Sequence, residues 1–288
     1  MLGSELPALR ERIATEGWGA QFLQRRRENG HWGRGFYQPK WISSHYTLLD
    51  IKNLGFPSDH PQICESISII LRDQKAGDGG IHPIGTVKQS DVCINGMFLN
   101  YACCFKAAQP SLHSVIDFVI TQHMPDGGFN CRFNRQGAVH SSMHSTLSVL
   151  EGIREYATNG YQYRLTELES IASDAHEFLL QHQLFRSHRT GETIDKRMTM
   201  LSYPSRWYYD ILRALDYFQA AGIRYDPRIG PALDILKSKQ RKDQTWPLQA
   251  KHPGETHFDM EKPGKPSRWN TLRALRVLKH FGEFEIAY

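Results

Sequence analysis

A recurring turn-and-helix unit constrains the fold of this chain more than any other feature. Four copies of one element consist of a glutamine and a nearby glycine-rich or tryptophan-containing turn: Gln24 with GHWG, Gln74 with DGGI, Gln122 with DGGF and, more weakly, Gln240 with QTW. A second element is a serine at the start of a predicted helix. It occurs five times, at Ser43, Ser90, Ser141, Ser205 and Ser267. The copies are about 50 to 60 residues apart, a period typical of repeated supersecondary units.

Each unit is predicted to hold an outer amphipathic helix, a glycine turn, an irregular loop and an inner helix capped by its serine. ICESISIILRDQ and LHSVIDFVITQH carry apolar residues at helical spacing, and no run alternates as strands do. The sequence therefore predicts an all-α fold of about five outer/inner helix pairs. An open solenoid is one arrangement of such pairs. A closed ring is favoured because the inner-helix starts are aromatic and polar, unlike a buried spine: His45, Tyr46, Cys93, His144, Trp207 and Trp269.

Length and composition predict the number of domains, the location of the protein and the class of its ligand. A chain of 288 residues with no obvious linker is expected to form a single domain over 1–288. Its first residues are charged, and no apolar run approaches the roughly 20 residues of a membrane-spanning helix, so we expect a cytoplasmic protein without a transmembrane segment. Five cysteines, an odd number, indicate reduced thiols. The net charge of +5 is spread along the chain, which suits an anionic small molecule and excludes a nucleic-acid footprint.

The glutamine-to-DGGF turn resembles the repeat shared by squalene-type cyclases and the β subunits of protein prenyltransferases, and the copies cover nearly the whole chain. This resemblance to the terpenoid cyclase and protein prenyltransferase superfamily implies an α/α toroid. Inner helices would line a central funnel, with their N-termini around one mouth. A ring of helix N-termini suits an anion such as diphosphate.

Within that superfamily, two acidic motifs of the cyclases, Asp-x-Asp-Asp and DDxxD, are missing from this sequence. The zinc prenyltransferases have Lys-x-x-Asp-x-Cys at one inner-helix start and a histidine at the next, and this chain has Lys88, Asp91 and Cys93 in KQSDVC, then His144. The resemblance implies that Asp91, Cys93 and His144 are zinc ligands and catalytic residues, and that Lys88 faces the diphosphate. Three such ligands leave a fourth position open on zinc for a substrate thiol or water.

Further substrate contacts are expected at other inner-helix starts. Arg206 and Arg268 are predicted to share the diphosphate charge. His45 and Tyr46 loosely resemble a His-x-x-Tyr-Thr segment of the family. An isoprenyl chain needs an apolar, aromatic-lined tunnel, and the residues predicted to line it are Tyr46, Phe98, Tyr101, Trp207, Tyr208 and Trp269.

Several positions depart from the family pattern. Gly85 stands where the family has an arginine, Ile94 where it has a tyrosine and Ser141 where it has an aspartate. The family's eukaryotic enzymes also pair with a separate helical subunit, so this chain is expected either to form a homo-oligomer or to work with such a partner. The alternative roles are structural: Asp91 stabilising a helix start, Cys93 a small buried residue and His144 a core imidazole.

The sequence thus predicts a prenyltransferase-like enzyme that acts on an isoprenoid (allylic) diphosphate and depends on zinc. Two alternatives stay open: a carbohydrate-active toroid, and a non-catalytic toroid that binds a lipid or a partner helix. Two further candidate sites are a metal pair of His140 and His144, and the long loop RSHRTGETID, which contains His188, Arg189, Glu192 and Asp195.

Overall fold

Helices form nearly all of the regular structure. The computed structural model describes residues 7–84 and 89–282. Its α-helices are α1 (Pro7–Thr15), α2 (Gly17–Gln24), α3 (Ser44–Asn53), α4 (Pro61–Asp73), α5 (Val92–Cys104), α6 (Gln109–Thr121), α7 (Phe133–Gln136), α8 (Met143–Thr158), α9 (Leu165–Gln181), α10 (Ile211–Ala220), α11 (Gly230–Ser238) and α12 (Arg268–His280). Short 3₁₀ helices are η1 (Lys40–Ile42), η2 (Lys196–Thr199) and η3 (Pro227–Ile229), and β1 (Trp246–Pro247) pairs with β2 (Pro266–Ser267) antiparallel. The predicted all-α class is confirmed.

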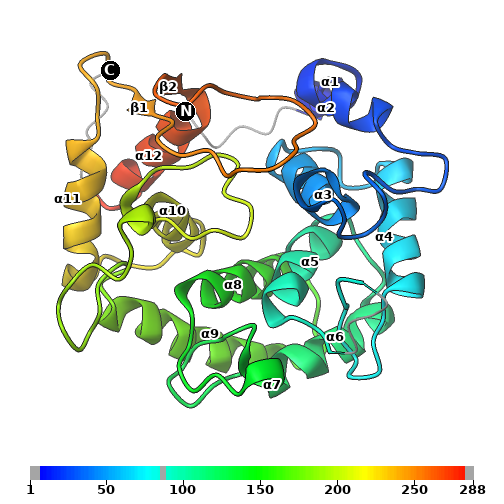
Figure 1. Cartoon of the computed structure of the whole chain (residues 1–288), viewed down its shortest axis with the longest axis horizontal. Helices are drawn as coiled ribbons and strands as arrows, with labels where there is room; N and C mark the ends of the chain where they lie inside the picture. Colours follow the sequence, from blue (N-terminus) through cyan, green and yellow to red (C-terminus); the bar gives the residue numbers. More distant parts are fainter. Residues whose placement is uncertain (1–6, 85–88, 283–288) are drawn as a thin grey trace.

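Inner and outer helices alternate along the chain. Figure 1 shows α3, α5, α8, α10 and α12 in the interior, with α4, α6, α9 and α11 around the outside. α5 packs against α3 and α8, and α10 packs against α12. The outer helices α6, α9 and α11 pack against α5, α8 and α10 respectively. This is the pairing that the repeat predicts.

The outer helix α4 shows why the repeat folds this way. Ile63, Ile67 and Ile70 fall at helical spacing, and all three are buried. Each buried side chain of this kind contributes roughly 1.5–3 kcal/mol relative to an exposed one. Pro61 occupies the first turn, where its missing N–H costs no hydrogen bond, and the helix ends at the glutamine of the turn, Gln74.

Two inner helices start where the serines predict. Ser43 precedes α3 and Ser267 precedes α12, and the Ser267 hydroxyl accepts a hydrogen bond of 2.9 Å from the Asn270 backbone N–H. The other three caps were predicted wrongly, because Asp91, Ser142 and Asp210 hold those positions instead of Ser90, Ser141 and Ser205. The largest shift is at α10, which begins only at Ile211.

Ser90 and Ser141 are not caps because they bind the preceding glycine turn. The backbone N–H and the hydroxyl of Ser141 both donate to the Asp126 carboxylate, at 2.8 and 2.5 Å. Ser90 holds Asp78 in the same way, with both distances 2.7 Å. Gly127 follows Asp126 at φ +90°, and a Cβ there would lie 2.9 Å from the Asp174 carbonyl oxygen of α9. The DGG turn is therefore fixed between the outer helix and the serine.

Replacing Asp126 with alanine is expected to lower the free energy of unfolding by about 1–3 kcal/mol, because a charged acceptor of two hydrogen bonds is lost. Urea denaturation of D126A measures the loss. The matched control is E169A, which removes an exposed acid on α9. Equal stabilities of D126A and E169A would contradict this role for the turn.

The N-terminal part of the chain meets the segment before β2 along a seam of contacts. The indole N–H of Trp41 donates to the Pro253 carbonyl at 2.6 Å, and the Thr47 hydroxyl lies 2.8 Å from Nε2 of His257. The rings of Phe22 and Phe258 pack with centroids 4.8 Å apart. The segment before β2 thus covers α2 and α3, joining the first inner helix to the last.

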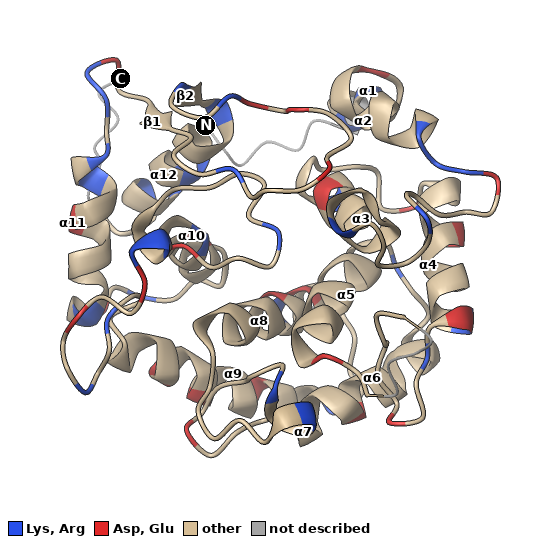
Figure 2. Cartoon of the chain, in the orientation of Figure 1, with Lys and Arg blue, Asp and Glu red and all other residues tan. Residues whose placement is uncertain are grey.

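Charge is distributed without a single dominant basic element. Figure 2 shows Lys and Arg in blue on many helices and loops, interspersed with acids in red. Among the helices of the described residues, none has the length and apolar character needed to cross a membrane.

Candidate functional site

Asp91 and Cys93 lie at the start of α5, as predicted. Asp91 holds the N-cap position, and its half-buried carboxylate forms an ion pair with Arg135 of α7. Burial raises the pKa of Asp91, an effect that Arg135 opposes. The carboxylate therefore already has a cationic partner.

The Cys93 thiol lies beside Cys131, which the sequence did not single out. The interaction with Cys131 and burial raise the pKa of Cys93, while the same interaction lowers the pKa of Cys131 below the usual thiol range. The Cys131 backbone N–H donates to the Ser145 hydroxyl at 3.2 Å. Cys131 stands shortly after DGGF, a position that carries no family motif.

His144 faces a different set of neighbours. Its Nδ1 accepts a hydrogen bond of 2.8 Å from the Tyr209 backbone N–H, so the neutral imidazole carries its proton on Nε2. Burial lowers the pKa of His144 to about 4, and Arg213 adds to the effect. The ring packs edge-on against Trp207, with centroids 5.2 Å apart.

These side chains do not fit a zinc site in this arrangement. Within residues 7–84 and 89–282, no three His, Cys, Asp or Glu side chains form a group that could hold a metal ion. The lone pair of His144 is used by a backbone N–H, Asp91 is paired with Arg135, and the free thiol of Cys93 lies beside that of Cys131. The helical pair of His140 and His144 is not formed either, because α8 begins at Met143 and leaves His140 outside the helix. Zinc at Asp91, Cys93 and His144 stays a prediction.

Several predicted substrate contacts belong to the core. His45, Tyr46, Phe98 and Tyr101 are fully buried. Nδ1 of His45 lies 3.2 Å from the Tyr101 hydroxyl, and burial lowers the pKa of His45 to about 3. These four residues therefore pack in the interior and do not line the cavity described below, and the tunnel stays a prediction.

Arg206 and Trp207 lie in the loop before α10. Arg206 is in the left-handed conformation, with φ 58°, and forms a buried ion pair with Asp50 of α3. Trp207 stacks on Tyr208, with centroids 4.0 Å apart, and Tyr208 stacks on His252 at 3.8 Å. This aromatic stack also lies outside the cavity.

The remaining predicted contacts are at the start of α12. Arg268 is exposed, and its guanidinium lies 5.3 Å from the ring centroid of Trp18. Trp269 stacks on Tyr203, with centroids 5.0 Å apart, and both line the cavity. Lys88 lies outside the described residues.

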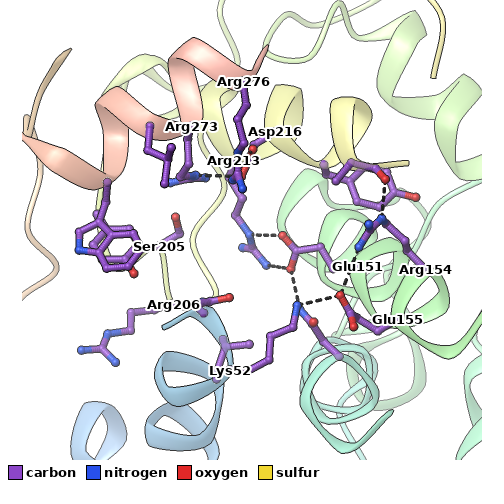
Figure 3. Close-up of a pocket in the computed structure, with 18 residues that line it drawn as sticks. Lys52, Glu151, Arg154, Glu155, Ser205, Arg206, Arg213, Asp216, Arg273 and Arg276 are labelled. Atoms are coloured by element: carbon purple, nitrogen blue, oxygen red, sulfur yellow. Dashed lines mark hydrogen bonds and ion pairs between the residues drawn. The ribbon is translucent and has the colours of Figure 1, made fainter. Parts of the chain in front are cut away.

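A cavity of about 200 Å³ lies among the inner helices, and all five of them contribute to its wall. Its lining is rich in charge (Figure 3). Six cationic residues face it, namely Lys52, Arg154, Arg206, Arg213, Arg273 and Arg276. Within residues 7–84 and 89–282, three acidic residues line it, namely Glu151, Glu155 and Asp216. Even with Asp50 counted as the partner of Arg206, two positive charges are in excess.

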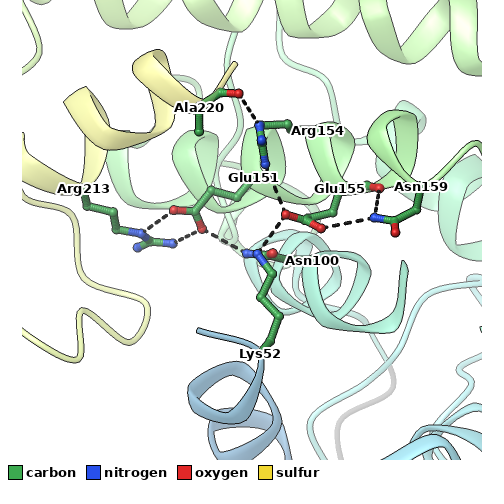
Figure 4. Close-up of polar contacts among 8 residues, drawn as sticks. All are labelled: Lys52, Asn100, Glu151, Arg154, Glu155, Asn159, Arg213 and Ala220. Carbon is green, nitrogen blue, oxygen red and sulfur yellow. Dashed lines mark hydrogen bonds and ion pairs between the residues drawn. The ribbon is translucent and has the colours of Figure 1, made fainter. Parts of the chain in front are cut away.

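One side of the cavity is a connected ion-pair network (Figure 4). Arg213, buried in α10, donates two hydrogen bonds to Glu151 of α8, at 2.9 and 2.7 Å. Glu155 holds two cations, the Lys52 ammonium at 2.9 Å and the Arg154 guanidinium at 3.2 Å. Here each carboxylate is neutralised by its neighbours.

The opposite side has unused donors. Asp216 of α10 binds both Arg273 and Arg276 of α12, at 3.1 and 2.9 Å. Nη1 of Arg273 and Nε of Arg276 are buried and have no hydrogen-bond partner among the described residues. The same holds for the indole nitrogen of Trp269. The Arg273 side chain is only 10% exposed. A buried donor left without an acceptor costs free energy, so this wall is suited to an anion.

A repeated sequence pattern marks two of these arginines. Arg213 and Arg273 occupy the same place in two inner helices, in ILRAL and TLRAL. A charged residue repeated in the apolar interior of successive inner helices indicates a polar centre.

No protein-family model matches the chain, and no curated protein does. Among solved structures, the chain is similar to a variant of the type II terpene cyclase MstE from Scytonema in complex with merosterolic acid A. That match has a TM-score of 0.38 and 12% identity, and it covers 95% of this chain and 96% of the other. A variant with geranylgeranyl dihydroxybenzoate gives 0.36 and 12%, over 95% and 96%. Likeness at this level does not establish a shared fold or activity.

Proposed function

We propose that this protein is a prenyltransferase-like enzyme that binds an isoprenoid (allylic) diphosphate, with the diphosphate in the central cavity. The observation that supports this most is the excess of positive charge there, concentrated where Arg273 and Arg276 share Asp216. Their unpartnered nitrogens offer charge-assisted hydrogen bonds to phosphate oxygens. The site thus has the charge of an anion-binding site and not the lining of an apolar tunnel.

The same arrangement would favour ionisation of an allylic substrate. As the bond between the allylic carbon and the diphosphate oxygen breaks, negative charge grows on the departing diphosphate. Guanidinium groups already fixed by Asp216 would stabilise that charge without reorganising. No step is assigned to zinc.

The prenyl chain would lie against the aromatic wall formed by Trp269 and Tyr203. A cavity of about 200 Å³ is smaller than the usual ligand pocket of roughly 300–1,000 Å³. It suits the diphosphate head and leaves the chain to extend from it past Trp18, which packs beside Trp269 at a centroid distance of 6.3 Å.

We also propose that the helix pairs close into the α/α toroid of the resemblance. Two observations support closure: one cavity is bordered by both α3 and α12, and the seam from Trp41 and Thr47 to Pro253 and His257 joins the ends of the array. An open solenoid would leave α3 and α12 apart.

Replacing Arg273 with glutamine is expected to weaken the binding of farnesyl diphosphate by about 10- to 100-fold, since a hydrogen bond to a charged group contributes about 1.5–3 kcal/mol. R276Q is expected to act in the same direction. Isothermal titration calorimetry measures both affinities. The matched control is R224Q, which removes the same charge from an exposed arginine that does not line the cavity.

Unchanged affinity in both R273Q and R276Q, or an equal loss in R224Q, would rule out this diphosphate site. Release of inorganic diphosphate by the wild type separates an enzyme from the non-catalytic alternative, which would bind without turnover. Circular dichroism checks that each variant is folded, and Asp216 keeps one arginine partner in either one.

A further inference from the structure

A second pocket lies away from the central cavity, on the outer side of the helices. It is a groove of about 1050 Å³ between the DGG turn at 123–127, the C-terminal half of α9 and the loop at 187–190. This loop is part of the RSHRTGETID segment, which the central cavity does not use. The histidines that line the groove are His123, His140, His182 and His188.

The charge of the groove suits a cation. Among the described residues, three acids line it, Asp126, Asp174 and Glu177, against one arginine, Arg189. Glu177 is also paired with Arg228 at 2.7 Å, which leaves one negative charge in excess. The whole chain carries a net charge of +5, so the charge of this groove is opposite in sign to that of the chain. Imidazole nitrogens are donors that suit zinc, copper and nickel.

Two of the histidines converge within this groove. Nδ1 of His182 donates a hydrogen bond of 2.8 Å to the Arg186 carbonyl, which leaves the lone pair of the neutral ring on Nε2. That Nε2 lies 3.3 Å from Nδ1 of His188, and the two rings are nearly perpendicular, at 79°. A backbone carbonyl that fixes the tautomer of a histidine is the usual outer support of a metal ligand.

The loop that carries His188 is closed by backbone hydrogen bonds. The Ser187 backbone N–H donates to the Glu192 carbonyl at 2.8 Å, and Gly191 donates back to Ser187 at 2.8 Å. Arg186 and Thr193 form an antiparallel bridge at its base. His188 is therefore presented from a closed turn, so little conformational entropy is lost when it binds.

We propose that His182 and His188 chelate a divalent transition-metal ion such as Zn²⁺. Two nitrogens each roughly 2.0–2.1 Å from a metal stand about as far apart as the 3.3 Å measured between these two. The ion would take the place of the proton that now joins them. Within the described part of the chain no third protein ligand completes the group, so water or a partner's donor would fill the open positions.

The test is titration of the metal-free full chain with Zn²⁺ by calorimetry, together with Cu²⁺ binding followed by electron paramagnetic resonance. The wild type should bind Zn²⁺, and its Cu²⁺ spectrum should show nitrogen ligands. H188A should bind Zn²⁺ at least about tenfold more weakly. His188 is exposed, so this variant should fold normally.

Two further variants complete the test. H140A, which removes an exposed histidine that lines the same groove, is the control and should bind Zn²⁺ as the wild type does. C93A, which removes the sulphur of the zinc site predicted from the sequence, should keep the Zn²⁺ that H188A loses. The proposal is overturned if the wild type does not bind Zn²⁺, if H188A binds like the wild type, or if only C93A loses the metal.

Discussion

Acidification from pH 7.5 to 4.5 is expected to lower the free energy of unfolding by several kcal/mol, because burial keeps five histidines neutral in the folded protein. Burial lowers the pKa of His144, His176, His252 and His257 to about 4 and that of His45 to about 3, against an ordinary value of 6.5. The unfolded chain takes up these protons below pH 6.5, while the folded protein does not until near pH 4. Each histidine thus stabilises the fold fully above pH 6.5, and this is lost as the pH falls.

The size of the effect follows from linkage. Between pH 6.5 and about 4, each histidine lowers the free energy of unfolding by up to about 1.4 kcal/mol for each pH unit of acidification. The partly exposed histidines contribute less to this loss. Asp50 acts in the opposite direction. Burial raises its pKa from 3.8 to about 6, so its contribution is full below pH 3.8 and is lost as the pH rises through 6. One carboxyl offsets only part of the effect of five imidazoles.

Urea denaturation at several pH values between 7.5 and 4.5 measures this loss. The variant H252N removes one of the five groups, so its stability should fall less steeply with decreasing pH. A stability that is flat over this range, or a slope unchanged in H252N, would contradict the assignment.

Replacing Gly152 with valine is expected to give the largest loss of stability from a single substitution in the inner helices. At the crossing of α5 and α8, a Cβ on Gly152 would lie 2.4 Å from the Gly96 carbonyl oxygen, and a Cβ on Gly96 would lie 2.6 Å from the Ser148 carbonyl oxygen. These neighbours are backbone atoms and cannot rotate away. Overpacking of this kind costs typically about 1–3 kcal/mol and occasionally more.

Thermal and urea denaturation of G152V and G152A measure the cost, which should be greater for valine. The matched control is G77A, since Gly77 has open space around its Cβ position. The crossing also holds Glu151, which borders the central cavity, so farnesyl diphosphate binding should weaken in G152A. Equal stabilities of G152A and G77A would show that the helices can separate at no cost.

The helix pairs could be predicted from the sequence because their signals are local. Helical spacing of apolar residues in α4 and α6, a proline in the first turn and a glutamine at the end are all visible within one repeat. The start of α10 could not be placed, because Ser205 looks like the serines that open other units. Its helix begins later because Asp210, which is held by the Ser202 hydroxyl at 2.6 Å, accepts the first free N–H from Arg213.

The candidate site was less predictable, because it depends on pairs between repeats. A motif search finds Asp91, Cys93 and His144 by type and spacing, yet their partners Arg135, Cys131 and Tyr209 come from elsewhere in the chain. Asp216 gathers arginines that lie 57 and 60 residues further along. No local pattern shows that Arg273 and Arg276 share one carboxylate. That sharing leaves some of their N–H donors free for an anion.

The seam between Trp41 and Pro253 has a consequence for how the chain folds during synthesis. These partners are separated by 212 residues, and Thr47 and His257 by 210. Contacts this distant are slow to form, since a long loop must close before they contribute. The first inner helix is therefore synthesised long before its partner. Its contact surface for the segment at 253–258 stays uncovered until that segment leaves the ribosome. Until then the growing chain should depend on chaperones, or bury that flank against another molecule.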